Sequence, residues 1–292
     1  MLKTIYNKIP FKRQLFTLIK KIYKPNSNIY QHLHFKGVFS VKIDANKSFK
    51  INHFGNIIEN ELFWSGIEKG WEKVSLGLWV KLCEDANSIV DIGANTGLYA
   101  LLGKAMNEGS KVYAFEPVVR VFDKLEFNNK LNQYDIFCSP YALSNKNGSA
   151  IIYDIPNTDH IYSVTVNKNM FTPETPTVKI EIQTKTLDTF IEEEDIEQID
   201  LIKIDVETHE PEVLEGYLSN LKKHQPSILI EVLNDDVGRR IENIVKDMGY
   251  LYFNIDENSG VKKVDSILKS DYYNYLLCTK EVAHKIGILS NE

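Results

Sequence analysis

From residue 88 onward, short apolar runs alternate with helical segments, and this alternation constrains the fold more than any other feature of the chain. The predicted strands are 88–92, 111–116, 135–138, 200–205, 227–233, 250–254 and 274–279, and the predicted helices are 97–107, 118–131, 211–222 and 236–248. Apolar strands that alternate with helices are typical of a parallel sheet covered on both faces. The sequence therefore predicts an α/β fold with a doubly wound, mostly parallel sheet of seven strands.

The segment 149–186 interrupts this alternation. Its ends, SAIIYDI and VKIEIQT, have the pattern of two antiparallel strands, and they flank a polar stretch that contains three prolines. Excursions of this length from a compact core are usually functional. We expect an inserted β-hairpin that forms a lid or faces the substrate.

The N-terminal region, residues 1–75, differs from the rest of the chain in charge. Nine Lys and Arg residues precede the first acidic residue, Asp44, although the whole chain has a formal charge of −6. Within residues 1–24, apolar and basic side chains follow helical spacing. Three interpretations stay open: a helix packed on the protein body, a helix on an anionic membrane surface, or an arm that contacts a partner or a second copy. Short strands are expected in 25–60 and one helix with three tryptophans in 61–84.

Composition excludes several classes of protein. The negative net charge does not favour a general nucleic-acid binder, and no run approaches the ~18 apolar residues of a membrane span. The three cysteines form no CxxC pair and no cluster with histidine, so a zinc site or a disulfide framework is not expected. We predict a cytoplasmic protein, with peripheral contact at the inner face of a membrane as the alternative that residues 1–24 leave open.

The motif VDIGANTG follows the first predicted strand of the sheet and opens a helix. Glycines there allow a tight turn and a close approach to a ligand, and the helix start offers free N–H groups. The spacing is G-x-x-x-G and not the G-x-G-x-x-G of dinucleotide enzymes, and Asp91 would repel a pyrophosphate. A carboxylate suits a cationic ligand, which favours S-adenosyl-L-methionine over NAD. The candidate ligand-binding residues in this motif are Asp91, Gly93, Ala94, Asn95, Thr96 and Gly97.

Two further segments fall at strand ends, where ligands bind in such sheets. Glu116 ends the second strand about 20 residues beyond the glycine loop, where an acid can accept both ribose hydroxyls of either cofactor. The segment YALS follows the third strand, where backbone could meet an adenine edge. Its candidate residues are Ala142, Leu143 and Ser144.

The segment IKIDVETHEP puts carboxylates and an imidazole at the same edge of the sheet. The strand ends at Asp205, and Pro211 is suited to the first turn of the following helix. Transfer of a methyl group to a hydroxyl is helped by a base close to the acceptor oxygen. We consider His209 as the base with Glu207 orienting it, or Glu207 acting directly. No metal is predicted, although a divalent ion held by these residues with Glu231 is an alternative.

The ordered set VDIGANTG, FEP, ALS, TLDTF and IKIDVETHEPEVLEG resembles the FkbM family of S-adenosylmethionine-dependent methyltransferases over about residues 88–254. The resemblance implies a class I, Rossmann-like methyltransferase domain over 76–292. It implies S-adenosyl-L-methionine as cofactor, and O-methylation of a sugar hydroxyl in a glycan or of a small natural product. It also implies that 91–97 hold the methionine part, Glu116 the ribose and 142–144 the adenine, with 205–210 lining the transfer site.

One residue departs from the family pattern. The family usually has glycine at the position of Thr208, and a β-branched residue is disfavoured at positive φ, so we expect the local backbone or the acceptor pocket to differ. Two other functions stay open: a non-catalytic S-adenosylmethionine-binding scaffold in a glycan-assembly complex, and an NAD-linked sugar oxidoreductase.

Overall fold

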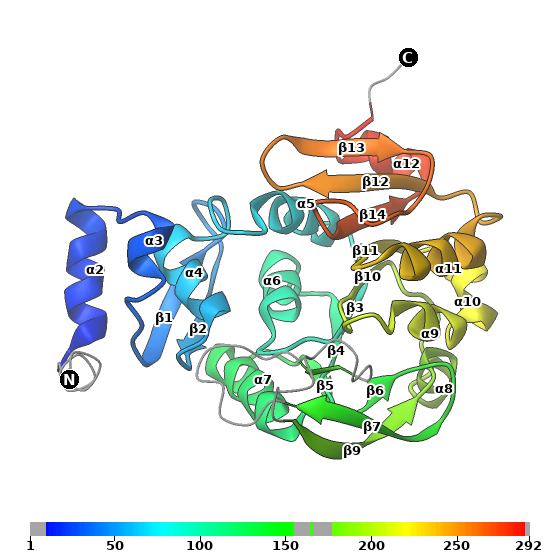
Figure 1. Ribbon diagram of the computed structural model, residues 1–292, viewed down its shortest axis with the longest axis horizontal. Coiled ribbons are helices and arrows are strands. Elements are labelled where there is room, and N and C mark those ends of the chain that lie inside the picture. Colours follow the sequence, from blue (N-terminus) through cyan, green and yellow to red (C-terminus); the bar gives the residue numbers. More distant parts are fainter. Residues whose placement is uncertain (1–9, 155–163, 166–176, 290–292) are drawn as a thin grey trace.

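The centre of the molecule is one eight-stranded sheet (Figure 1). The computed structural model describes residues 10–154, 164–165 and 177–289. The strand order is β13-β12-β14-β11-β10-β3-β4-β5, in which β11, β10, β3, β4 and β5 run parallel, and β14, β12 and β13 are added through antiparallel pairings. The bounds are β3 Ser88–Ile92, β4 Lys111–Phe115, β5 Phe137–Ser139, β10 Leu201–Ile204, β11 Ser227–Glu231, β12 Leu251–Asp256, β13 Gly260–Val264 and β14 Asn274–Cys278.

The predicted class I, Rossmann-like α/β fold is thus confirmed, with one strand more than expected. The extra strand is β13, which pairs with β12 at the sheet edge. Its sequence, GVKKV, is short and carries two exposed lysines. Charged edge strands are common because the charges discourage pairing with other chains. The same charges interrupt the apolar pattern by which β13 could have been predicted as a strand.

Helices cover both faces of the sheet. Their bounds are α5 Lys73–Cys83, α6 Leu98–Met106, α7 Val119–Asn132, α8 Leu187–Glu193, α9 Glu210–Glu215, α10 Leu218–His224, α11 Asp235–Val245 and α12 Lys280–Lys285. Ile89 belongs to one core cluster, with Trp79 and Leu101, whereas Val90 belongs to a second, with Leu214 and Ile241. Successive residues of one strand therefore enter different cores, as a sheet buried on both faces requires.

The predicted helix 211–222 is interrupted between α9 and α10. At Gly216 a side chain would collide with the carbonyl oxygen of Ser144, because the end of β6 passes against the helix. This close approach connects α9 to the loop that follows β6.

The inserted hairpin is confirmed as part of a second, four-stranded sheet. Its strands are β6 Ala142–Leu143, β7 Gly148–Asp154, β8 Val164–Thr165 and β9 Val178–Lys185, in the order β6-β9-β7-β8. The antiparallel ladder of β7 and β9 runs from Gly148 opposite Thr184 to Asp154 opposite Val178. Most of the polar stretch lies outside the described residues, so its role as a lid stays a prediction.

The N-terminal region forms a small layer beside α6 and α7. It contains α2 Lys12–Ile22, α3 Ser27–Tyr30, β1 Gly37–Lys42, β2 Ser48–His53 and α4 Ile57–Ser65. This confirms the short strands and the amphipathic helix, of which residues 1–9 lie outside the described part. In Figure 1, α2 is farthest from the large sheet. In the described ranges, no helix has the length and apolarity that crossing a bilayer requires.

The single helix predicted over 61–84 is wrong. It is two helices, α4 and α5, because the chain turns at Gly66, where φ is +71°. Trp64 and Trp79 are buried, whereas Trp71 lies in the connection and is 40% exposed. The break brings Trp71 and Glu72 toward the carboxyl ends of the large sheet's parallel strands, where both line a cavity.

Candidate active site

A cavity of about 340 Å³ lies at the carboxyl ends of β3, β4, β10 and β11. This is the edge at which open α/β sheets bind ligands. Most of the predicted site residues line it. They are Asp91, Gly93, Ala94, Asn95, Thr96, Glu116, Ala142, Leu143, Asp205, Glu207 and His209.

Two predicted residues, Gly97 and Ser144, are not among the lining residues. Gly97 begins α6 at φ +94°, and a Cβ there would lie 2.6 Å from a methyl carbon of Leu125. Gly93, at φ +78°, has no room for a Cβ because of the carbonyl oxygen of Asp205. Both positions thus require glycine because neighbouring protein atoms leave no room for a side chain and because φ is positive. Close approach to a ligand is not needed to explain either glycine.

Asp91 connects the sheet to the start of α6. It is 1% exposed, and its Oδ2 accepts a hydrogen bond from Ala100 N at 2.9 Å. Burial raises the pKa of the Asp91 carboxyl to about 7. A cation bound beside it would stabilise the ionised form.

Glu116 holds the glycine loop against the end of β4. Its Oε2 accepts a hydrogen bond from Asn95 N at 3.1 Å and its Oε1 one from Val118 N at 2.9 Å. Burial raises the pKa of Glu116 to about 7. Asn95, which adopts φ +51°, has a buried side-chain oxygen without a hydrogen-bond partner.

These features fit a nucleoside ligand with hydroxyl and ammonium groups. The unpartnered Asn95 oxygen and the Glu116 carboxylate can accept N–H and O–H donors. Beside them the wall is apolar and can cover an aromatic base. The apolar lining residues of this wall are Val118, Val121, Leu143, Ile152 and Ile182.

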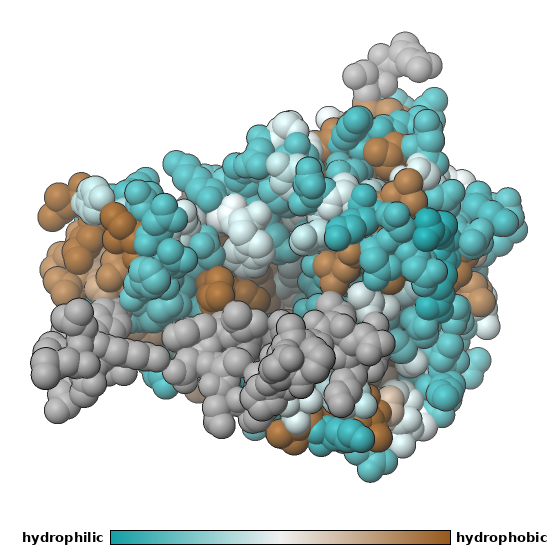
Figure 2. Space-filling view, viewed as in Figure 1, coloured by the Kyte–Doolittle hydropathy of each residue, from teal (hydrophilic) through white to brown (hydrophobic). Residues whose placement is uncertain are grey.

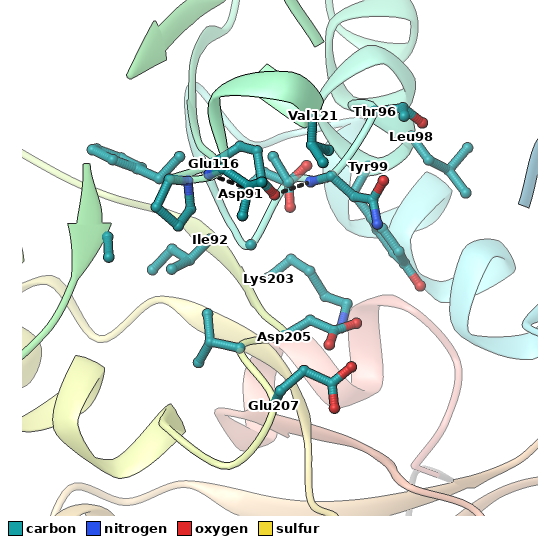
Figure 3. Close-up of a pocket in the computed structure, with 18 of the residues that line it drawn as sticks. Asp91, Ile92, Thr96, Leu98, Tyr99, Glu116, Val121, Lys203, Asp205 and Glu207 are labelled. Atoms are coloured by element: carbon teal, nitrogen blue, oxygen red, sulfur yellow. Dashed lines mark hydrogen bonds and ion pairs between the residues drawn. The ribbon is translucent and has the colours of Figure 1, made fainter. Parts of the chain in front are cut away.

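Lys203 lies at the centre of the opposite half of the cavity, between Asp91 and Asp205 (Figure 3). It is 1% exposed, and its Nζ is 3.2 Å from Asp205 Oδ2 and 5.3 Å from the centre of the Tyr99 ring. The Tyr99 hydroxyl donates to Glu72 Oε2 at 2.9 Å. A residue of the N-terminal region thus completes a buried ionic cluster with groups from β10 and α6.

The loop after β10 has a strained backbone. Glu207 and Thr208 adopt φ values of +54° and +79°. Thr208 therefore has the conformation in which glycine is favoured, at a cost that is stored in the loop. The fully buried Glu210 stabilises this shape, because its Oε1 accepts hydrogen bonds from Val206 N at 3.1 Å and Thr208 N at 3.3 Å.

Glu207 and Glu231 line the same cavity as Asp205. Burial, with a contribution from the charge of Asp205, raises the pKa of Glu207 to about 7 and that of Glu231 to about 9. Figure 3 shows the Asp205 and Glu207 carboxylates on the same side of the cavity. No group of three or more His, Cys, Asp or Glu side chains in the described part of the chain is arranged to hold a metal ion.

His209 contacts residues other than Glu207. Its Nε2 is 3.0 Å from Ser144 Oγ, and its Nδ1 is 3.5 Å from Glu212 Oε2. Glu212 in turn pairs with Arg240 at 2.8 Å. Burial lowers the pKa of His209, which favours the neutral imidazole.

Sequence comparison identifies the domain. Residues 91–252, more than half of the chain, match the model of the methyltransferase FkbM domain. The chain is 28% identical over 190 residues to methyltransferase sdnD of Sordaria araneosa, covering 56% of this chain and 73% of that protein. It is 25% identical over 173 residues to the hexuronic acid methyltransferase AglP of Haloferax volcanii, covering 59% of this chain and 66% of that protein.

Solved structures with similar folds share little sequence with the chain. A methyltransferase FkbM from Methylobacillus flagellatus has a TM-score of 0.43 and 15% identity, covering 66% of this chain and 43% of that one. A SAM-dependent O-methyltransferase from Thermotoga maritima has a TM-score of 0.36 and 11% identity, covering 72% of this chain and 66% of that one. The chain thus spans less than half of the solved FkbM chain.

Proposed function

The chain belongs to the FkbM family of S-adenosylmethionine-dependent methyltransferases, and on this premise we propose that it methylates a hydroxyl of a sugar or of a small natural product. The observation that carries the proposal is the position of Glu207, a carboxylate with a pKa near neutrality in the wall of the same cavity as the nucleoside-binding loop. A relative that is named as a hexuronic acid methyltransferase supports a sugar as the class of acceptor, and the charge of this chain's own cavity is the ground for proposing a neutral one.

We propose that the glycine loop and Glu116 hold the cofactor. When bound, S-adenosyl-L-methionine supplies a methyl group on a positively charged sulfur. Asp91 and the backbone of 93–96 face the methionine part, Glu116 accepts from the ribose hydroxyls, and Ala142 and Leu143 cover the adenine. Gly97 and Ser144 contribute by packing the chain behind this wall.

Of the two candidate bases, we favour Glu207. With a pKa of about 7, its carboxylate can accept the proton of the acceptor hydroxyl at neutral pH as the oxygen takes the methyl group. Because Nε2 of His209 contacts Ser144 Oγ and its Nδ1 is turned toward Glu212, we assign His209 a positioning role. It joins the loop after β10 to the loop after β6.

The charge of the cavity favours a neutral acceptor. Six carboxylates line it, and Lys203 is the one Lys or Arg among the described lining residues. Lys203 is already paired with Asp205. Two unit charges ~5 Å apart repel by about 3 kcal/mol at an effective dielectric constant of ~20, so an acidic sugar would bind poorly beside the ionised form of Glu207. The half-exposed Trp71 offers an aromatic face on which an uncharged ring can stack.

The test is a methyl-transfer assay on the full chain with labelled S-adenosyl-L-methionine and a panel of neutral, amino and acidic saccharides, together with small hydroxylated natural products. We expect label on a hydroxyl oxygen of a neutral acceptor. If the protein binds S-adenosylhomocysteine in a calorimeter but methylates no acceptor, the non-catalytic scaffold is the better description. We also propose a cytoplasmic location, because all three cysteines are free.

A further inference from the structure

One face of α2 presents apolar side chains to solvent. Phe11, Leu15, Leu18 and Ile22 follow one another at spacings of four, three and four residues, which places them on one side of a helix. Their exposed fractions are 75, 44, 57 and 90%. In Figure 2, hydrophobic atoms gather over the outer side of the region that α2 occupies in Figure 1. We call these four residues the α2 stripe.

The opposite face of α2 fixes the helix to the protein. Arg13 Nη1 donates to Val38 O at 2.8 Å, Phe16 is buried against other aromatic rings, and Lys20 donates to Phe63 O. These contacts come at spacings of three and four residues and define the inner face. The α2 stripe therefore points outward for a structural reason, since the helix cannot turn without breaking its anchors.

The surroundings of the stripe are basic. Lys21 and Lys24 are exposed at the end of α2, and the first acidic residue of the chain is Asp44. We propose that α2 is a docking surface for an anionic lipid bilayer, with the α2 stripe entering the interface and the lysines facing the headgroups. Amphipathic helices with apolar residues on one face and basic residues beside them bind membranes in this way.

The same features make a second copy of the chain a poor occupant. The helix has eleven residues and is ~16 Å long, so its stripe offers a contact much smaller than the ~800 Å² per partner that stable interfaces bury. Pairing two stripes would also bring the lysines of both copies together. Neither obstacle applies to an anionic bilayer. Binding to it does not require a large contact between two folded proteins, and its negative charge complements the lysines.

Vesicle sedimentation with the purified full chain tests the proposal. We expect binding to vesicles of 30% phosphatidylglycerol in phosphatidylcholine at low salt, and loss of binding to pure phosphatidylcholine or at 0.5 M NaCl. The double variant Leu18→Ser/Ile22→Ser should bind at least about tenfold more weakly because apolar area is lost. Lys21→Glu/Lys24→Glu should bind at least about thirtyfold more weakly, because each lysine near the surface contributes ~1 kcal/mol and each glutamate adds repulsion.

Matched controls distinguish the loss of α2 docking from a general effect of removing an apolar side chain or reversing charges on the protein surface. Leu218→Ser removes an apolar side chain of similar exposure on α10, and Lys262→Glu/Lys263→Glu reverses two exposed charges on β13. Both should bind vesicles like the wild type. Equal binding to neutral and anionic vesicles, no binding to either, or a dimer in light scattering that Leu18→Ser/Ile22→Ser abolishes would each overturn the proposal. None of these results depends on methyl transfer.

Discussion

His209 Nε2 lies 3.0 Å from Ser144 Oγ, and this contact joins the loop after β10 to the loop after β6. With Nδ1 facing Glu212, the imidazole bridges a hydroxyl and a carboxylate of two different elements. The acceptor side of the cavity, which begins at Glu207, is thereby held in register with Ala142 and Leu143 on the proposed adenine side.

We expect loss of the contact between His209 and Ser144 to disturb the position of the acceptor side of the cavity. The catalytic base, Glu207, would remain in place. Ser144→Ala and His209→Gln should each lower kcat/KM about fivefold, the equivalent of one buried hydrogen bond of ~1 kcal/mol. The measurement is kcat/KM as a function of pH. The apparent pKa of this profile should be the same in both variants as in the wild type. A His209→Gln variant that is inactive at every pH would restore His209 as the base.

The strain at Thr208 predicts a stabilising substitution. Thr208→Gly should raise the free energy of unfolding by about 0.5–1 kcal/mol, because relief of the φ of +79° exceeds the entropy that glycine adds to the unfolded chain. Urea unfolding monitored by circular dichroism measures the change. Thr208→Ala, which removes the β-branch and keeps a Cβ, should gain less; an equal gain for alanine would show that backbone strain is not the cause.

The buried Glu210 predicts a stability that falls with rising pH. Its pKa is raised by burial from 4.5 to about 7, so the folded state keeps a proton that the unfolded state releases between these values. The stabilisation is complete below pH 4.5 and is lost as the pH rises through 7, at about 1.4 kcal/mol for each pKa unit. Free energies of unfolding at pH 5.5 and 8 should differ less in Glu210→Gln than in the wild type. An unchanged difference would mean that other groups cause it.

The acidic cavity wall predicts a change of selectivity in Glu231→Gln. Because its pKa is about 9, Glu231 carries this charge only at high pH, so at pH 10 its removal should raise kcat/KM for an acidic saccharide about tenfold relative to its neutral counterpart. The two acceptors are compared as a matched pair, a glucuronoside and a glucoside of the same aglycone, or the corresponding pair for the sugar that the acceptor panel identifies. Glu126→Gln, which neutralises a partly exposed carboxylate on α7 that does not line the cavity, serves as control. A constant ratio in both variants would contradict electrostatic selection by the cavity.

Local patterns predicted the main sheet and the sheet edge at which most of the candidate residues line one cavity. The strands β3, β4, β10 and β11 are apolar runs with acidic residues at or near their carboxyl ends. Both their positions and their common edge therefore follow from local sequence. Lys203 pairs with Asp205, two residues away on the same side of the chain. That spacing is visible in the sequence and indicates the pair.

The remaining parts of the site depend on packing between distant segments. Trp71 and Glu72 reach the cavity because the chain turns at Gly66 and the N-terminal region packs beside α6, and no motif marks either residue. His209 is bound by Ser144, which is 65 residues away in the chain. Long-range contacts of this kind leave no periodic signal in a single sequence.

The most direct test of the account is the pH dependence of methyl transfer in the wild type and in Glu207→Gln, with donor and acceptor saturating. The account predicts that wild-type kcat rises with pH, is half-maximal at about pH 7 and levels off about one pH unit above that, because the Glu207 carboxylate must be ionised to accept the proton. In Glu207→Gln this rise should be absent and kcat should be ~10²–10⁴-fold lower, with the affinity for S-adenosylhomocysteine unchanged. A variant with wild-type kcat and an unchanged pH profile would contradict the assignment of Glu207 as the base.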